Sequence, residues 1–316
     1  MPQIYSLEPE RRTLHGHFSR DLEPVLTIEP GDTVQYRTLD SGWGLEPRAG
    51  GAYKPRREFA GRIKGLDDGH ALIGPIAIRG AEPGLTLEVA IKAIQPRTWG
   101  DCLAGGWPSA VNKRLGIADT GIVHAWTLDP LTMTGRNHLG QMVTLRPFMG
   151  ILGMPPAEPG VHSTIPPRNC GGNLDCKELI AGSTLYLPIS VPGALFSVGD
   201  GHAVQGDGEV GGTAIECPMD RVELTFDVLH NFPITTPTAH TPSGWLTMGF
   251  HQDLHEATFI ALEAMFALMG KLYGLERLDA IALASLTVDL RITQIVNEVC
   301  GVHALLPHGA IQQGLR

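Results

Sequence analysis

The stretch Val25-Leu-Thr-Ile-Glu-Pro-Gly-Asp-Thr-Val-Gln-Tyr36 gives the first indication of the fold class. Apolar residues at alternating positions flank Pro30-Gly31-Asp32, a pattern typical of two strands joined by a turn. The same design returns at residues 76–91 and again at residues 179–198. Three such units predict a mainly β protein, either a β-sandwich or a barrel, built from meanders.

The C-terminal part has a different pattern. Asp253 is placed to cap a helix of apolar residues at helical spacing, and Gly274 is placed to end it. A shorter helix is expected over residues 276–284. Apolar and polar residues then alternate from 286 to 293, which predicts a strand. The C-terminal part is therefore expected to be α+β.

Irregular segments suggest where the domains divide. Residues 38–68 and 148–172 combine glycine, arginine and proline without periodicity and are expected to be long loops, while residues 230–249 resemble a proline-rich linker. We therefore predict a β-rich domain over residues 1–230 and a smaller α/β subdomain over residues 231–316, with a single integrated domain as the alternative.

Charge and cysteine content narrow the partners and the compartment. The chain of 316 residues has a net charge of −9, which excludes nucleic acid and anionic membrane as expected partners. Residues 1–12 are polar and charged, so no signal segment is expected there. The five cysteines are scattered and form no CxxC pair, which favours reduced thiols and a cytoplasmic location.

The densest polar segment contains Gly199-Asp-Gly-His202 and Gln205-Gly-Asp-Gly-Glu209, and Asn173-Leu-Asp175 precedes it by about 25 residues. Its glycines allow tight turns that bring short acidic side chains together, between flanking apolar stretches. A single Gly-Asp-Gly is usually only a turn. Several carboxylates beside a histidine need a cation, a proton or a basic partner, so the segment predicts a divalent metal site. Zinc is the first expectation, with manganese or calcium as alternatives.

Three motifs carry a resemblance to a known family: Arg168-Asn-Cys-Gly-Gly-Asn-Leu-Asp175, Gly182-Ser-Thr-Leu-Tyr-Leu-Pro188, and the run from Gly193 to Glu209. Together they resemble the signature of the acetamidase/formamidase family. Similar blocks occur at residues 24–34, 74–84 and 285–297, so the resemblance covers most of the chain. One departure is Leu85, where the family often has aspartate.

The resemblance implies hydrolysis of a small aliphatic amide, such as formamide or acetamide, to a carboxylate and ammonia. It also implies a β-rich scaffold with an α/β portion. The expected partner is this small-molecule substrate. A homo-oligomer is expected as well, because the C-terminal helix and strand can supply an interface.

The residues themselves suggest roles for the site. We predict that Asp175, Asp200 and His202 bind the metal and that Glu209 moves the proton. Asp207 is predicted to orient His202 or to join the metal shell. Glu209 and Asp200 can exchange roles, because the sequence does not fix their geometry.

The substrate carbonyl oxygen is predicted to bind Asn173 and the backbone N–H groups of Gly171 and Gly172. Further residues considered as completing the site or as a nucleophile are His15, His17, Asp40, His162, Cys170 and Cys176. Two alternatives stay open at this stage. One is a metal-free hydrolase that uses Asp207 and Glu209 as an acid/base pair, and the other is a non-catalytic metal-binding β-barrel.

Overall fold

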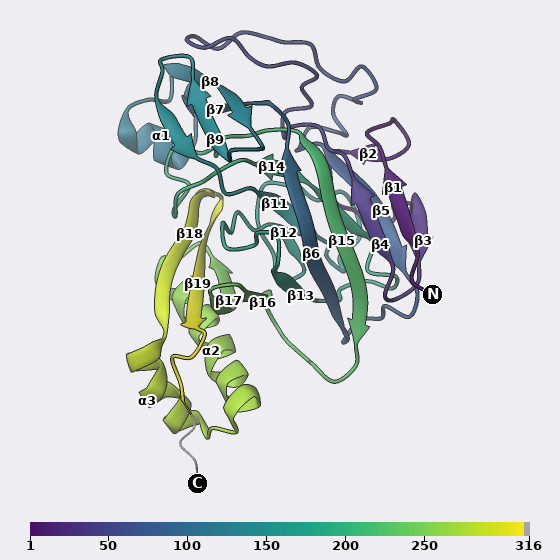
Figure 1. Cartoon of the computed structure of the whole chain (residues 1–316), viewed down its shortest axis with the longest axis vertical. Helices are drawn as coiled ribbons and strands as arrows, with labels where there is room; N and C mark the ends of the chain where they lie inside the picture. The colour runs from purple at the N-terminus through teal and green to yellow at the C-terminus, as the bar shows by residue number, and fades with distance from the viewer. Residues whose placement is uncertain (313–316) are drawn as a thin grey trace.

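The computed structural model describes residues 1–312, and most of their regular structure is β-strand. A nine-stranded sheet forms one layer of the molecule (Figure 1). Its strands, in spatial order, are β1 (Ile4–Leu7), β4 (Thr33–Tyr36), β15 (Met219–Leu229), β6 (Thr86–Pro96), β13 (Thr184–Pro188), β16 (Thr238–Thr241), β17 (Gly244–His251), β19 (Val299–Pro307) and β18 (Asp289–Asn297).

Two smaller sheets complete the β structure. The six-stranded sheet contains β12 (Gly171–Asn173), β11 (Phe148–Gly153), β14 (Phe196–His202), β5 (Leu72–Ile78) and β2 (Leu14–His15), with β3 (Leu26–Ile28) also paired to β5. The four-stranded sheet contains β10 (Met142–Thr144), β9 (Thr134–Asn137), β8 (Gly121–Asp129) and β7 (Trp99–Gly105). A short helix, α1 (Ala110–Leu115), follows β7 and was not predicted.

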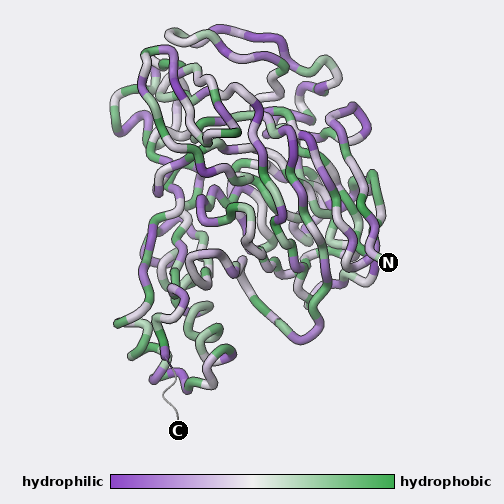
Figure 2. Tube along the Cα trace, in the orientation of Figure 1, coloured by the Kyte–Doolittle hydropathy of each residue, from purple (hydrophilic) through white to green (hydrophobic). Residues whose placement is uncertain are grey.

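The nine-stranded and six-stranded sheets share one hydrophobic core. Phe196 of β14 and Phe226 of β15 meet in it, with ring centroids 5.1 Å apart. Figure 2 shows hydrophobic residues repeated along these strands and hydrophilic residues along much of the loop at the top of the view. Burial of the apolar faces of two sheets against each other defines a β-sandwich. The predicted mainly β class with an α+β C-terminal part is therefore confirmed.

Each of the three predicted strand–turn–strand units connects the two sheets instead of forming a hairpin within one. β3 and β4, β5 and β6, and β13 and β14 each place one strand in the six-stranded sheet and the other in the nine-stranded sheet. The alternation of apolar residues marks which face of a strand is buried, but it does not say which sheet the strand joins. Meanders do occur, as in β7–β10.

The C-terminal helices cover β17 and β19 (Figure 1). α2 (Leu254–Tyr273) begins after Asp253, whose side chain accepts hydrogen bonds from two backbone N–H groups, and it ends at Gly274 with φ of 67°. Both predicted ends are confirmed. α3 (Arg277–Thr287) runs further than expected, so the strand predicted from residue 286 begins only at Asp289.

Two segments predicted to be irregular contain strands. Residues 148–172 include β11, and residues 230–249 include the hairpin β16–β17. Every residue of β11 is buried, so this strand shows no alternation of polar and apolar residues. The nine-stranded sheet contains strands from both sides of residue 230. The division into two domains at that residue stays a prediction.

The long loop predicted over residues 38–68 is present, and within it the structure assigns no named strand or helix. Its buried anchors are Trp43 and Arg56. Arg56 pairs with Asp40 of the loop and, at 3.0 Å, with Asp101 of β7. In residues 1–312 no single helix is long and apolar enough to cross a membrane; α2 and α3 meet the criterion only together, with a bend of 105°.

Candidate metal centre

Four carboxylates and one imidazole from separate parts of the chain meet in the interior. Asp175 follows β12, Asp200 and His202 belong to β14, and Glu209 and Glu216 lie in the segment after β14. None of these side chains belongs to a residue more than 6% exposed. We call Asp175, Asp200, His202, Glu209 and Glu216 the carboxylate–histidine cluster.

The ligand atoms of the cluster are close enough to share an ion. Atoms of Asp175, Asp200 and His202 lie within 4.8 Å of one another, and so do atoms of His202, Glu209 and Glu216. His202 Nε2 lies 3.4 Å from Asp200 Oδ1 and 3.3 Å from Glu216 Oε1. The structure thus brings together the three predicted ligands and adds Glu209 and Glu216 beside the same imidazole.

The backbone at this site is strained. Asp175, Asp200 and Glu209 have φ angles of 48°, 59° and 46°, in the left-handed region that residues with a side chain seldom adopt. Each such residue costs on the order of 1–3 kcal/mol, and such strain gathers at functional sites. The predicted glycine-rich turn is present at residues 206–212, but Gly199-Asp-Gly-His202 belongs to the buried strand β14, and the carboxylate residues themselves take the left-handed conformation.

Strand β11 forms one wall of the cluster. The rings of Phe148 and His202 are in edge contact, with centroids 4.9 Å apart. On the same strand, a Cβ atom added at Gly150 would lie 2.5 Å from Asp200 Oδ2 and 2.9 Å from Asp175 Oδ1. The backbone of Gly150 also accepts a hydrogen bond of 3.2 Å from the N–H of Asp175. Only glycine leaves room for the carboxylates at this position.

The electrostatic state of the cluster follows from burial and mutual repulsion. Burial, together with neighbouring carboxylates, raises the pKa of Asp175 well above its ordinary value. Burial raises the pKa of Glu209 to about 7 and that of Glu216 to about 8. Burial also disfavours the charged form of Asp200, but the charges of His202 and His70 and the hydrogen bonds of His202 and Glu216 together outweigh it and lower the pKa of Asp200. For His202 burial acts downward, while Glu216 and Asp200 raise its pKa.

Several polar atoms of the cluster are buried without a hydrogen-bond partner. They are Asp175 Oδ1, Asp200 Oδ1, His202 Nδ1, His202 Nε2 and Glu216 Oε2. Among residues 1–312, no lysine or arginine pairs with a cluster carboxylate. Burying such atoms without partners is costly, and protons or a cation can neutralise the charge. The mixture of carboxylate oxygens and imidazole nitrogen fits a divalent ion such as zinc.

One asparagine connects the cluster to its surroundings. Asn297 Nδ2 donates to Asp175 Oδ2 at 2.5 Å and to Glu209 Oε2 at 3.5 Å. On the other side of Asp175, Gln205 Nε2 donates to the backbone carbonyl at 2.9 Å. These donors hold Asp175 and Glu209 in place without adding a charge.

The other predicted site residues lie around the cluster. Asp207 is at the surface, where it pairs with Lys177 at 2.9 Å and lies 3.8 Å from Arg291. The N–H of Gly171 donates to the carbonyl of Arg168. Asn173 is buried and donates to the carbonyl of Ile165 at 3.0 Å, while its Oδ1 has no hydrogen-bond partner. Like Gly171 and Asn173, Gly172 belongs to β12.

The further histidines have partners of their own. His15 contacts the carbonyl of His17 at 2.7 Å and Ser197 Oγ at 2.9 Å, and His17 lies 3.9 Å from Asp67. His162 contacts the carbonyl of Glu158 at 2.9 Å.

The two cysteines considered as nucleophiles are buried. Burial raises the pKa of the Cys170 thiol and raises that of Cys176 to about 12. Such thiols are poorly suited to nucleophilic attack, because the thiolate is the reactive form.

Glu216 and Asn297 are absent from the predicted site. Glu216 stands between Ile215 and Cys217 in an apolar stretch, and a carboxylate in such a stretch is itself a signal of a functional group. Asn297 closes a motif that carries the family resemblance. It lies 122 positions from Asp175 along the chain, so only the folded structure shows their contact.

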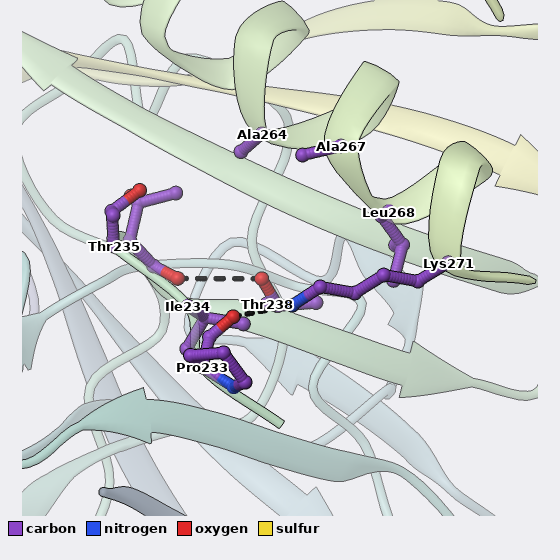
Figure 3. A pocket seen from close by; sticks show the side chains of 9 residues that line it. Pro233, Ile234, Thr235, Thr238, Ala264, Ala267, Leu268 and Lys271 are labelled. Carbon is purple, nitrogen blue, oxygen red and sulfur yellow. Dashed lines mark hydrogen bonds between the residues drawn. The ribbon is translucent and has the colours of Figure 1, made fainter. Parts of the chain in front are cut away.

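Two open cavities lie near the cluster: one contains Glu209, and the other contains Asn297, which donates to Asp175. One of about 800 Å³ is lined by Asn297 and by His70, whose charge lowers the pKa of Asp200. The other, of about 490 Å³, is lined by Glu209 and Trp126. A third pocket of about 100 Å³ lies between α2 and residues 233–238, where Lys271 donates to the carbonyl of Pro233 (Figure 3). It contains neither a cluster residue nor Asn297, which donates to the cluster, so the first two cavities are the candidates for substrate access.

The fold and the cluster define a β-sandwich protein with a buried carboxylate–histidine centre suited to a divalent ion. The chain belongs to the acetamidase/formamidase family, because the model of that family matches residues 5–163 and 157–311. The resemblance seen in the sequence is therefore confirmed. Membership places the chain among the hydrolases that act on carbon–nitrogen bonds, the amidases.

Relatives and solved structures agree with this assignment. An acetamidase of Mycolicibacterium smegmatis is 27% identical over 325 residues, covering 80% of this chain and 78% of that protein. The crystal structure of an acetamidase from Yersinia enterocolitica is 28% identical with a TM-score of 0.84, covering 99% of this chain and 94% of that one. An acetamidase from Bacillus halodurans, 24% identical with a TM-score of 0.81 and coverage of 96% and 97%, shares the fold.

Proposed function

We propose that this protein hydrolyses a carboxamide, in the simplest case formamide or acetamide, to a carboxylate and ammonia with the help of a divalent metal ion. The observation that carries the proposal is the buried carboxylate–histidine cluster with its unpartnered atoms. The names of the related acetamidases support the reaction.

Asp175, Asp200 and His202 would hold the ion, and Glu216 stands close enough to His202 to add a fourth ligand. Zinc suits a set that includes imidazole, while manganese or calcium would suit a carboxylate-rich set. A bound ion of this kind polarises a carbonyl oxygen and acidifies water.

The chain supplies the movement of protons. Amide hydrolysis requires that water lose a proton and that the leaving nitrogen gain one. Glu209 would accept the proton from water and deliver it to the nitrogen, which then leaves as ammonia. Its carboxylate borders an open cavity and lies 3.5 Å from Asn297 Nδ2, which keeps it oriented. Asp200 remains the alternative proton carrier, in which case Glu209 would be a ligand.

The remaining predicted residues concern binding of the substrate and the loop that carries Glu209. We assign Asn173 to the substrate carbonyl oxygen, directly or by fixing the loop of Ile165, to which it donates. Gly171 and Gly172, which precede Asn173 in β12, would set the backbone path that brings Asn173 to the loop of Ile165. Asp207 lies at the surface of the loop that carries Glu209, in an ion pair with Lys177 that contributes little to the site. A direct catalytic role of Asp207 stays a prediction.

Ammonia release tests the reaction itself. Purified protein supplied with zinc, manganese or calcium in turn should release ammonia from formamide or acetamide. Metal at full occupancy with no release from any amide would instead favour a non-catalytic metal-binding protein. Release that does not depend on any metal would favour an acid/base hydrolase that uses neutral and ionised carboxyl groups of the cluster.

Replacement of Gly150 by alanine is expected to lower metal content and amidase activity by about tenfold or more, because the added Cβ would lie 2.5 Å from Asp200 Oδ2. Gly206→Ala is the matched control, since a Cβ there meets no atom within 4 Å. Metal analysis and ammonia release measure both. An alanine at position 150 that leaves metal content and rate unchanged would show that the cluster is not the site.

The cellular compartment and the oligomeric state are proposed from the cysteines and from the exposed apolar side chains. All five cysteines are free, which supports a reducing compartment such as the cytoplasm. Leu278 and Leu286 of α3 are 79% and 81% exposed, and Leu290 of β18 is 47% exposed, which supports a homo-oligomer that covers this apolar face. Light scattering should give a mass above that of one chain, and Leu286→Glu should reduce it.

A further inference from the structure

The cavity of about 800 Å³ beside Asn297 is larger than formamide or acetamide requires. Sites of about 300–1,000 Å³ typically enclose ligands of drug-like size. The cavity is open to solvent, and its wall includes Asn297, whose side chain donates to Asp175 of the cluster. A carboxamide held near Asn297 would therefore leave most of the cavity to the rest of its molecule.

The wall of this cavity is mainly apolar. The apolar side chains come from four separate segments and are Leu103, Trp107, Val111, Ile165, Val296 and Val299. None of the described residues that line it is lysine or arginine, and Glu298 adds a negative charge. Apart from His70, an anionic group would find no cationic side chain among these lining residues, and Glu298 would repel it.

Trp107 is held in place by close packing. Its backbone carbonyl accepts a hydrogen bond of 3.1 Å from Asn112 Nδ2, and a Cβ atom at Gly212 would lie 2.7 Å from the indole. A large aromatic side chain seated in this way offers an apolar surface at low conformational cost.

Resting on the proposed function, we propose that the preferred substrates are primary amides with an uncharged apolar chain or ring of several carbons, which lies against Trp107 and Ile165 while the carboxamide faces Asn297 and the cluster. Burial of each methylene is worth about fourfold in kcat/KM. Hexanamide and phenylacetamide should therefore exceed acetamide in kcat/KM by about tenfold or more. Adipamate, which resembles hexanamide with a carboxylate at the far end, should fall below hexanamide by a similar factor.

Variants locate the apolar group. Trp107→Ala should lower the ratio of kcat/KM for phenylacetamide over acetamide by about tenfold, as removal of a large contact surface predicts. Ile165→Ala, at a residue 40% exposed, should lower the ratio in the same direction and should leave the fold intact. Trp126→Ala is the matched control, because Trp126 lines the neighbouring cavity of about 490 Å³. A ratio that falls in Trp126→Ala and not in the other two variants would overturn the proposal.

A readout that needs no turnover separates this proposal from the proposed function. Cys300 lines the same cavity and is half-buried, so hexanamide should slow its alkylation by iodoacetamide more than acetamide does. Hydrolysis of acetamide with no gain for hexanamide, and equal alkylation with both amides, would overturn the cavity assignment alone. Protection of Cys300 by hexanamide without ammonia release from any amide would support the cavity and contradict the proposed function.

Discussion

Glu209→Gln is expected to lower kcat for amide hydrolysis by about 100-fold or more while the bound metal remains. The substitution keeps the shape of the side chain but removes its ability to accept a proton. In the native protein Asn297 Nδ2 donates to Glu209 Oε2 at 3.5 Å. The amide oxygen of the introduced glutamine can still accept this hydrogen bond, so the local structure should persist. Steady-state kinetics and metal analysis on the same preparation measure the two effects separately.

Metal content decides the role of Glu209. If Glu209→Gln loses its metal, Glu209 is a ligand and the proton carrier must be sought elsewhere, with Asp200 as the first alternative. If the variant keeps its metal and its full rate, Glu209 has neither role. Asn297→Asp is a useful companion, because it replaces the donor to Asp175 with a further carboxylate and should disturb both groups.

Asp200→Asn is expected to purify with little metal and to lose about 1,000-fold or more of the wild-type activity. The cluster would lose one anionic ligand, and a bound ion contributes several kcal/mol of transition-state stabilisation. The side chain is 2% exposed, and its Oδ1 has no hydrogen-bond partner and lies 3.4 Å from His202 Nε2 within the cluster. Metal analysis and ammonia release again provide the measurements.

Asp207→Asn is the matched control, because it makes the same chemical change seven residues further along the chain. Asp207 lies at the surface in an ion pair with Lys177, and exposed pairs are typically worth less than about 1 kcal/mol. Activity and metal content should therefore stay near those of the wild type. A loss in Asp207→Asn as large as that in Asp200→Asn would assign Asp207 to the site and support its predicted catalytic role.

The sequence predicted the fold class and the ends of α2, because these depend on local patterns. The cap at Asp253 and the stop at Gly274 each act on adjacent backbone groups. Strand β11 could not be predicted in this way, since a strand buried on both faces shows no alternation. The assignment of β3 and β4 to different sheets likewise depends on long-range packing.

The same difference between local patterns and long-range packing applies to the site residues. Asp175, Asp200, His202 and Glu209 come together as predicted, because β14 itself carries Asp200 and His202 while the segments after β12 and β14 carry Asp175 and Glu209. The pattern of the segment did not indicate where Asp207 lies, because Asp207 is two residues from Glu209 in the sequence but on the surface in the structure. Spacing along a turn does not fix the direction of a side chain when φ changes sign, as it does at Glu209.

Metal dependence is tested by the metal content of freshly purified protein together with its activity before and after a chelator. We expect about one divalent ion per chain at the carboxylate–histidine cluster. Amidase activity should fall with the ion and return when zinc or another suitable ion is restored. Full activity in protein shown to be free of metal would contradict the central claim.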